Sequence, residues 1–176
     1  YFQYAMTDNQ FKEYIEKNFN KKRKIIDYIL APTEQNQKYL RKYIQTNFIA
    51  SGFLKNNEVK LKKVKKKYDL MIISEYRNNM DKKKEKVIKS ALSKLSKIIN
   101  NKKIKVCIAL ASSRPEKKIN QKDEISFFKK FNFKFNILKI GSYELANKSK
   151  MIFSINSNLG YELLSRKFKV LFFTNG

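Results

Sequence analysis

The sequence predicts an α/β fold built on a doubly wound parallel sheet. Three observations lead to this class. Short apolar runs alternate with helical stripes of apolar residues through the second half of the chain. The run over 104–111 is apolar at every position except Lys105, as expected of a strand covered on both faces. Residues of apolar type make up 42% of the 176 positions, so the chain can bury a sizeable core.

The second half supplies five expected strands and four expected helices in strict alternation. The strands are expected at 68–74, 104–111, 133–140, 151–155 and 168–173. The helices are expected over the apolar stripe 87–99, over 125–131, over 142–148 with Ser142 as its cap, and over 161–166. Asp123 and Glu124 fall near the positive N-terminal end of the second of these helices. We expect this α/β domain to span 68–176.

The first half predicts a partial α/β domain over 6–54. Its elements are a helix around 11–19, a strand at 25–31, a helix over 33–45 and a strand at 47–50. Residues 1–5 resemble the remnant of an engineered cleavage tag. Residues 55–67 are nearly all Lys and Asn, so we expect a solvated linker there; the alternative is a polybasic lipid-binding segment.

The net charge of +25 favours anionic partners, but it has a second explanation. Lys, Asn, Ile, Phe and Tyr are all abundant, which is the bias that an AT-rich genome imposes on any protein. No aromatic-and-basic RNA-binding motif and no recognition helix is visible, so nucleic acid is not the expected partner. The lack of His excludes Ser-His catalysis and the usual zinc sites, and the single cysteine, Cys107, is expected in the core.

Two kinds of segment are not found in the sequence. No apolar run reaches the roughly 20 residues of a membrane helix, and no signal peptide precedes the first helix. We therefore expect a soluble, cytoplasmic chain that can associate peripherally with the inner face of the cell membrane through its basic surface.

The stretch 154–173 carries the clearest functional pattern, because it predicts strand, loop, helix and strand in turn. The polar turn 156–160 would lie at the carboxyl end of a parallel strand, where open sheets bind ligands. The helix that follows offers backbone N–H groups to an anion, and Glu162 would lie in its first turn. We expect the binding site here.

Three segments resemble one enzyme family: 137–146, 151–162 and 169–173. They look like the C-terminal, nucleotide-sugar-binding domain of a GT-B-fold glycosyltransferase of bacterial surface-carbohydrate (capsule or lipopolysaccharide) biosynthesis. The stretches 27–30 and 47–52 resemble the last β-α-β unit of the N-terminal domain of that family. Asn158 stands where relatives usually have Ser or Thr, and no Gly precedes the last strand.

The resemblance implies a role for each residue of the loop. Glu162 would accept hydrogen bonds from ribose hydroxyls, and Ser157, Asn158 and Gly160 would bind the phosphates. Ile140 and Gly141 would contact the base. Each role has an alternative. Glu162 would be an acid favoured by the helix dipole, and the loop residues would serve ordinary N-capping. Ile140 and Gly141 would form a plain turn before a helix.

Arg77 and Arg114 are the candidate catalytic residues, because each follows a strand and could offset phosphate charge in the transition state. The alternative is that both are solvated arginines at the rim. Glu75 is a weaker catalytic candidate, since the base in this fold usually comes from the N-terminal domain. The resemblance implies no metal, and no cofactor beyond the nucleotide sugar that serves as substrate.

The sequence thus predicts a transferase that moves a sugar from a nucleotide-activated donor to a glycan or lipid-linked acceptor. Two alternatives stay open. One is a nucleotide-sugar epimerase of the same fold, and the other is a non-enzymatic basic module that binds nucleic acid.

Overall fold

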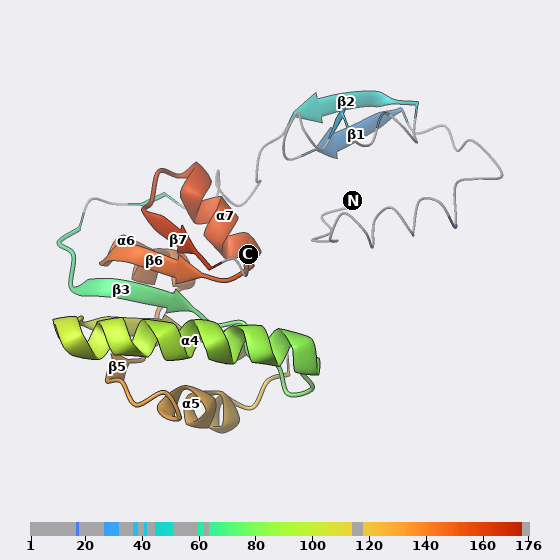
Figure 1. Cartoon of the computed structure of the whole chain (residues 1–176). Coiled ribbons are helices and arrows are strands. Elements are labelled where there is room, and N and C mark those ends of the chain that lie inside the picture. The colour runs from blue at the N-terminus through green and yellow to red at the C-terminus, as the bar shows by residue number, and fades with distance from the viewer. Residues whose placement is uncertain are drawn as a thin grey trace. The chain divides into compact units, whose positions relative to one another are not determined.

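The computed structural model describes residues 17, 27–31, 37–38, 41, 45–50, 60–61, 64–113 and 118–173. The chain divides into two compact units, 1–60 and 61–176. Figure 1 shows the helices and strands with their labels.

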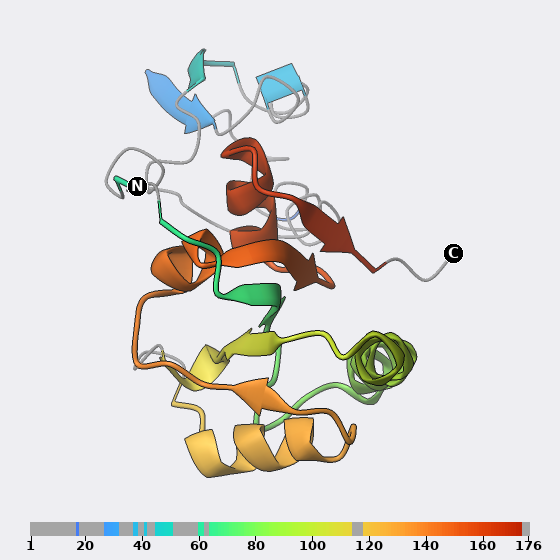
Figure 2. The same cartoon turned by 90° about the vertical axis from the view of Figure 1, so that its left-hand side faces the viewer.

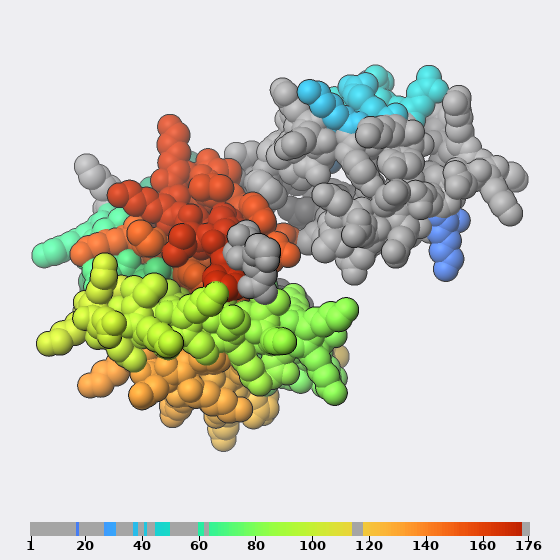
Figure 3. Space-filling model, in the orientation of Figure 1, coloured from blue at the N-terminus to red at the C-terminus, as the bar shows by residue number. Residues whose placement is uncertain are grey.

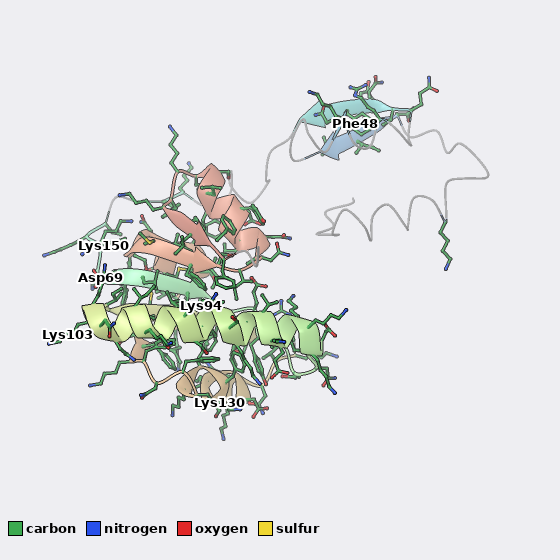
Figure 4. The ribbon with its side chains drawn as sticks, viewed as in Figure 1. Phe48, Asp69, Lys94, Lys103, Lys130 and Lys150 are labelled. Atoms are coloured by element: carbon green, nitrogen blue, oxygen red, sulfur yellow. The ribbon has the colours of Figure 1, made fainter. Side chains whose placement is uncertain are left out.

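The first unit contains a pair of parallel strands, β1 (Tyr28–Ala31) and β2 (Asn47–Ala50). Tyr28 lies opposite Asn47, and the Arg41 guanidinium lies over the ring of Phe48 at 5.0 Å from its centroid. Figure 4 labels Phe48 on β2. Both strands fall within predicted segments. The expected helices at 11–19 and 33–45 lie mostly outside the described residues, of which 17 and 37–38 are helical, and the tag remnant 1–5 lies wholly outside them.

The second unit is built on five parallel strands. They are β3 (Tyr68–Ile73), β4 (Val106–Ala109), β5 (Phe135–Asn136), β6 (Ser149–Ser154) and β7 (Val170–Phe172). Their order across the sheet is β5-β4-β3-β6-β7. The chain moves outward from β3 through β4 to β5 and then returns to the other side of β3 with β6. The direction of winding therefore reverses between β3 and β6.

Helices cover both faces of this sheet. They are α4 (Lys82–Lys102), α5 (Gln121–Lys129), α6 (Ser142–Asn147) and α7 (Asn158–Ser165), with a short 3-10 turn, η1 (Ala111–Ser113), after β4. Figure 2 shows α4 end-on at one side of the strands and α6, in orange, at the other. The predicted α/β class with a parallel sheet is confirmed.

The alternation of side chains along each strand explains this two-sided core. On β3, Leu70 and Ile72 pack with α4 and α5, whereas Met71 and Ile73 pack with α6 and α7. Successive positions of the central strands are therefore buried on both faces, which is why 70–73 of β3 and 106–109 of β4 are continuously apolar. Cys107 on β4 is fully buried, and this burial raises the pKa of its thiol to about 11, so the thiol stays protonated at neutral pH.

The long helix α4 agrees closely with its sequence pattern. Its buried side chains are Ile88, Ala91, Leu92, Leu95 and Ile99. Asp81 caps it by accepting the Lys84 backbone N–H at 3.2 Å, and the helix ends at Lys103, whose backbone is left-handed with φ 49°.

The expected strand at 133–140 is much shorter than predicted. Only Phe135 and Asn136 pair with β4, because the chain then leaves the sheet edge. Phe133 and Phe135 contact the core on the α4 side, whereas Leu138 and Ile140 contact the core on the α6 side. The apolar run therefore continues because the chain wraps around the edge of the sheet.

Two predicted helix starts are wrong in detail. The N-cap of α6 is Gly141, with no side-chain cap bond, and Ser142 is the first residue of the helix. Helix α7 begins at Asn158 instead of Tyr161, so part of the expected turn is helical and no acid lies in its first turn. Glu162 consequently lies one turn into the helix. A favourable interaction with the helix dipole therefore does not account for an acid at this position.

Candidate functional site

The carboxyl ends of the strands bring the predicted rim residues to one edge of the sheet. Because all five strands are parallel, the loops after β3, β4 and β6 lie at the same edge as the N-termini of α5 and α7. Open α/β sheets bind ligands at this edge, where the winding reverses. In this chain that place lies between β3 and β6.

The loop from β6 into α7 is held by two internal acceptors. The Asn156 backbone N–H donates to Glu75 Oε1 at 2.5 Å, and the Ser157 N–H donates to Ser154 Oγ at 3.2 Å. Ser157 is the N-cap of α7, and its carbonyl accepts the Gly160 N–H at 2.8 Å. The next two N–H groups, of Asn158 and Leu159, have no protein acceptor among the described residues.

Gly160 lets α7 lie directly against β6. A Cβ at this position would stand 2.6 Å from Ser154 Oγ and 2.8 Å from Ser154 Cβ, which are closer than real Cβ contacts. The absence of a side chain therefore sets the distance between the helix and the strand. Gly160 shapes the site, whereas a direct phosphate contact through its N–H is disfavoured because that N–H bonds to Ser157.

Glu162 contacts the neighbouring helix on the same face. Its Oε2 accepts a hydrogen bond from the Tyr143 hydroxyl of α6, and the Arg166 guanidinium lies over the Tyr143 ring at 5.2 Å from its centroid. Glu162 is half-buried, and its other carboxylate oxygen keeps acceptor capacity. Tyr143 thus fixes the direction of the carboxylate predicted to meet a ribose.

Ile140 and Gly141 lie at the start of α6, two to three residues before Tyr143. Ile140 packs partly into the core on that face, while Gly141 is exposed and a Cβ there would meet nothing within 4 Å. Because Tyr143 hydrogen-bonds to Glu162, the predicted base-contacting pair lies within three residues of a direct partner of Glu162. The space beside Gly141 is open.

The two candidate catalytic arginines have different outcomes. Arg77 lies in the loop after β3, partly buried, and its Nη1 donates to the Tyr76 carbonyl at 2.6 Å. Arg77 is thus at the expected edge, but its guanidinium is held in part by its own loop. Arg114 lies outside the described residues.

The loop after β4 is closed by a buried carboxylate that the sequence did not single out as part of the rim. Glu124 of α5 is fully buried, and it accepts the N–H groups of Ala111 at 2.8 Å and Ser112 at 2.9 Å. The Ser74 hydroxyl also donates to it. Three segments, the end of β3, η1 and α5, are thereby joined at one group, as expected for a buried charge that must be hydrogen-bonded.

Sequence patterns did not identify Tyr143, Ser154 or Glu124 as residues that shape this edge, and gave Glu75 only a weak catalytic role. Tyr143, Glu124 and Glu75 act through contacts between different elements, whereas Ser154 accepts from Ser157 within its own loop. The one available signal was the position of Glu75 and Ser154 next to the ends of apolar strands, where a polar group borders the carboxyl edge.

The surface of the second unit is strongly basic along α4. Its exposed lysines are Lys82, Lys83, Lys84, Lys86, Lys89, Lys94, Lys97 and Lys102. Figure 3 shows the yellow-green side chains of this helix projecting across one face. None of the described helices is long and apolar enough to cross a membrane, and the described residues contain no cluster of three or more potential metal ligands from Cys, Asp or Glu.

A family model described as "putative O-antigen biosynthesis protein" matches residues 87–175, just over half of the chain. The chain belongs to this family. The match covers Ile140, Gly141 and the whole α7 loop with Glu162, and it leaves out Glu75 and Arg77. No curated protein matches the chain. Membership of the O-antigen biosynthesis family agrees with the expected role in surface-carbohydrate biosynthesis.

Proposed function

We propose that the second unit is the donor-binding domain of a GT-B-type glycosyltransferase that works in O-antigen biosynthesis. On this proposal the sheet is the doubly wound, Rossmann-like C-terminal domain of that fold. The strand order with its reversal between β3 and β6 supports it, and so do the helices on both faces. The reaction moves a sugar from a nucleotide-activated donor to a growing glycan or lipid-linked acceptor.

One observation carries the proposal: α6 and α7 begin at the same edge of the sheet and are joined there by Tyr143 and Glu162. A nucleotide that lay across these two helix starts would meet three kinds of group in order. The base would lie by Ile140 and Gly141, the ribose hydroxyls would donate to Glu162, and the phosphates would accept from the N–H groups of Asn158 and Leu159.

The catalytic contribution of this domain would be electrostatic. Negative charge grows on the leaving phosphate in the transition state, and hydrogen-bond donors fixed in advance stabilise it most. The α7 N-terminus, the side chains of Ser157 and Asn158, and Arg77 or Arg114 would supply those donors. No residue of the described chain is assigned as the base that activates the acceptor.

The basic face of α4 would help the enzyme meet its acceptor. An anionic lipid surface at the inner face of the cell membrane, or an acidic glycan, would be attracted to these exposed lysines. The attraction would weaken with salt, because exposed charges are screened over about 10 Å at 0.1 M ionic strength.

The test is a thermal-shift and calorimetry panel of UDP, GDP, CDP, CMP and their sugars. At least one nucleotide should raise the unfolding midpoint, and Glu162→Ala should bind that nucleotide about tenfold more weakly, because a charged hydrogen-bond acceptor is lost. Lys97→Ala, an exposed lysine on α4, serves as the matched control and should bind it normally.

Three outcomes would contradict the proposal in different ways. Equal binding by Glu162→Ala would remove the ribose assignment. Turnover of a nucleotide sugar without any acceptor would indicate an epimerase. Tight, salt-dependent binding to arbitrary DNA or RNA without any nucleotide response would indicate a nucleic-acid-binding module.

A further inference from the structure

Glu75 is a buried carboxylate at the carboxyl end of the central strand. Only 6% of the residue is exposed, in a chain where acids are outnumbered 15 to 40 by Lys and Arg. A charged group is costly to bury unless hydrogen bonds replace the water it loses. Its contacts therefore indicate what it does.

The two carboxylate oxygens of Glu75 face different partners. Oε1 accepts the Asn156 backbone N–H at 2.5 Å, while Oε2 lies 4.0 Å from Lys84 Nζ. The Lys84 side chain is 51% exposed, so this ion pair is screened by water and contributes little. The hydrogen bond to Asn156 is the contact that fixes the carboxylate.

This hydrogen bond lies just beyond the last ladder pair of β3 and β6. Ile72 is the register partner of Phe153, and the same offset places Glu75 opposite Asn156. Beyond Ile73 the chain turns out of the strand, so its backbone carbonyls no longer serve β6. The Glu75 side chain supplies the missing acceptor instead.

The neighbouring N–H is held in the same way. Ser157 donates to Ser154 Oγ at 3.2 Å, and Ser154 is itself fully buried. With two consecutive N–H groups fixed, the direction of the next two, Asn158 and Leu159, is set before any ligand arrives. Such preorganisation lowers the entropy cost of binding.

We propose that Glu75 is a positioning residue of the donor site, which holds the loop from β6 into α7 so that the Asn158 and Leu159 N–H groups point at the donor phosphate. This inference rests on the proposed function. It assigns Glu75 no proton transfer and no contact with the ligand. What it requires is an acceptor at this position, and a negative charge is not needed.

The test compares three variants with the wild type. Glu75→Gln keeps an oxygen that can accept from Asn156, and Glu75→Ala removes it. Glu124→Gln is the matched control, because Glu124 is also a buried carboxylate at the same edge and accepts from the loop after β4. Affinity for UDP, GDP, CDP and CMP is measured by calorimetry, and amide hydrogen exchange is followed at Asn156 to Leu159.

We expect Glu75→Ala to bind the best of these nucleotides about tenfold more weakly and to lose exchange protection at Asn156, with the amides of α4 unchanged. Glu75→Gln should bind within about twofold of the wild type, because its amide oxygen restores the acceptor. Glu124→Gln should unfold at a lower temperature and keep its nucleotide affinity.

Two results would overturn the inference alone: wild-type affinity in Glu75→Ala, or a loss in Glu75→Gln as large as in Glu75→Ala. The second result would mean that the negative charge of Glu75 is required and that an acceptor oxygen alone is not sufficient. If the wild type binds none of the four nucleotides, the proposed function fails instead, so the two failures can be told apart.

Discussion

The loops after β4 and after β6 lie at the same edge of one sheet, and each has backbone N–H groups bonded to a buried carboxylate. They differ in which backbone N–H groups remain without a protein acceptor. Glu124 accepts the Ala111 and Ser112 N–H groups of the β4 loop and a serine hydroxyl, and it is fully buried. Glu75 takes one N–H of the β6 loop and leaves the helix start beyond it open. The Ala111 and Ser112 N–H groups are bonded within the protein, whereas the Asn158 and Leu159 N–H groups have no protein acceptor among the described residues.

This difference teaches where a proposed anion site can be sought in a parallel sheet. A helix N-terminus or a loop at the carboxyl edge is not enough, because the protein's own acids can occupy it. After β6, the Asn156 and Ser157 N–H groups nearest the strand bond internally, and the Asn158 and Leu159 N–H groups at the helix start have no protein acceptor among the described residues.

The largest expected effect comes from removing the Glu124 carboxylate that accepts from the loop after β4. Glu124→Ala leaves the Ala111 and Ser112 N–H groups buried without an acceptor, so we expect unfolding to become easier by about 3 kcal/mol. Urea unfolding measures this loss. Nucleotide affinity below the unfolding transition should stay within about twofold of the wild type, and a large loss of affinity would mean that the two loops are not independent.

Sequence patterns predicted well the strands and helices that carry these two loops. The stripe on α4 and the continuous apolar runs of β3 and β4 follow from the period of each element and from burial on both faces. The class of the fold and the place of the α7 loop were therefore accessible from the residues alone.

The sequence could not predict which groups meet across the sheet edge. Glu75 and Asn156 are 81 residues apart, and Tyr143 meets Glu162 only because α6 and α7 share a face. The length of β5 was also inaccessible, because an apolar run that wraps around an edge has the same composition as a long strand.

A second prediction tests the packing beneath the open loop. Gly160→Ala puts a Cβ 2.6 Å from Ser154 Oγ, so α7 must move away from β6, at a cost of about 2 kcal/mol and with weaker nucleotide binding. Gly141→Ala is its control at the other helix start, where the added Cβ meets nothing, and its stability should change by less than about 0.5 kcal/mol. Equal stability of the two variants would contradict the close approach of α7.

The smallest effect is expected at the opposite edge of the sheet. Asp69 at the start of β3 accepts from Lys150 Nζ at 2.8 Å and from the Lys105 N–H at 2.9 Å, and Figure 4 shows Asp69 and Lys150 side by side. Because the pair is exposed, Lys150→Ala should cost less than about 0.5 kcal/mol and leave nucleotide affinity unchanged.

The pH dependence of that pair has a defined sign. The hydrogen bonds from Lys150 and Lys105 lower the pKa of Asp69 below its ordinary value of 3.8. Its contribution to stability is therefore present above pH 3.8 and is lost as the pH falls through the lowered pKa. Lys150→Ala should reduce this acid-dependent loss in urea unfolding measured between neutral and acidic pH, and an unchanged pH profile would mean that the Lys150 contact does not act on Asp69.

The most direct test of the central claim is a backbone amide NMR titration with the nucleotide that binds best. The account predicts that the largest shifts fall on Asn158 and Leu159, with further shifts at Gly141 and Glu162 and almost none at Ala111 and Ser112. Shifts concentrated at Ala111 and Ser112, or along the lysines of α4 with the α7 loop unchanged, would contradict it.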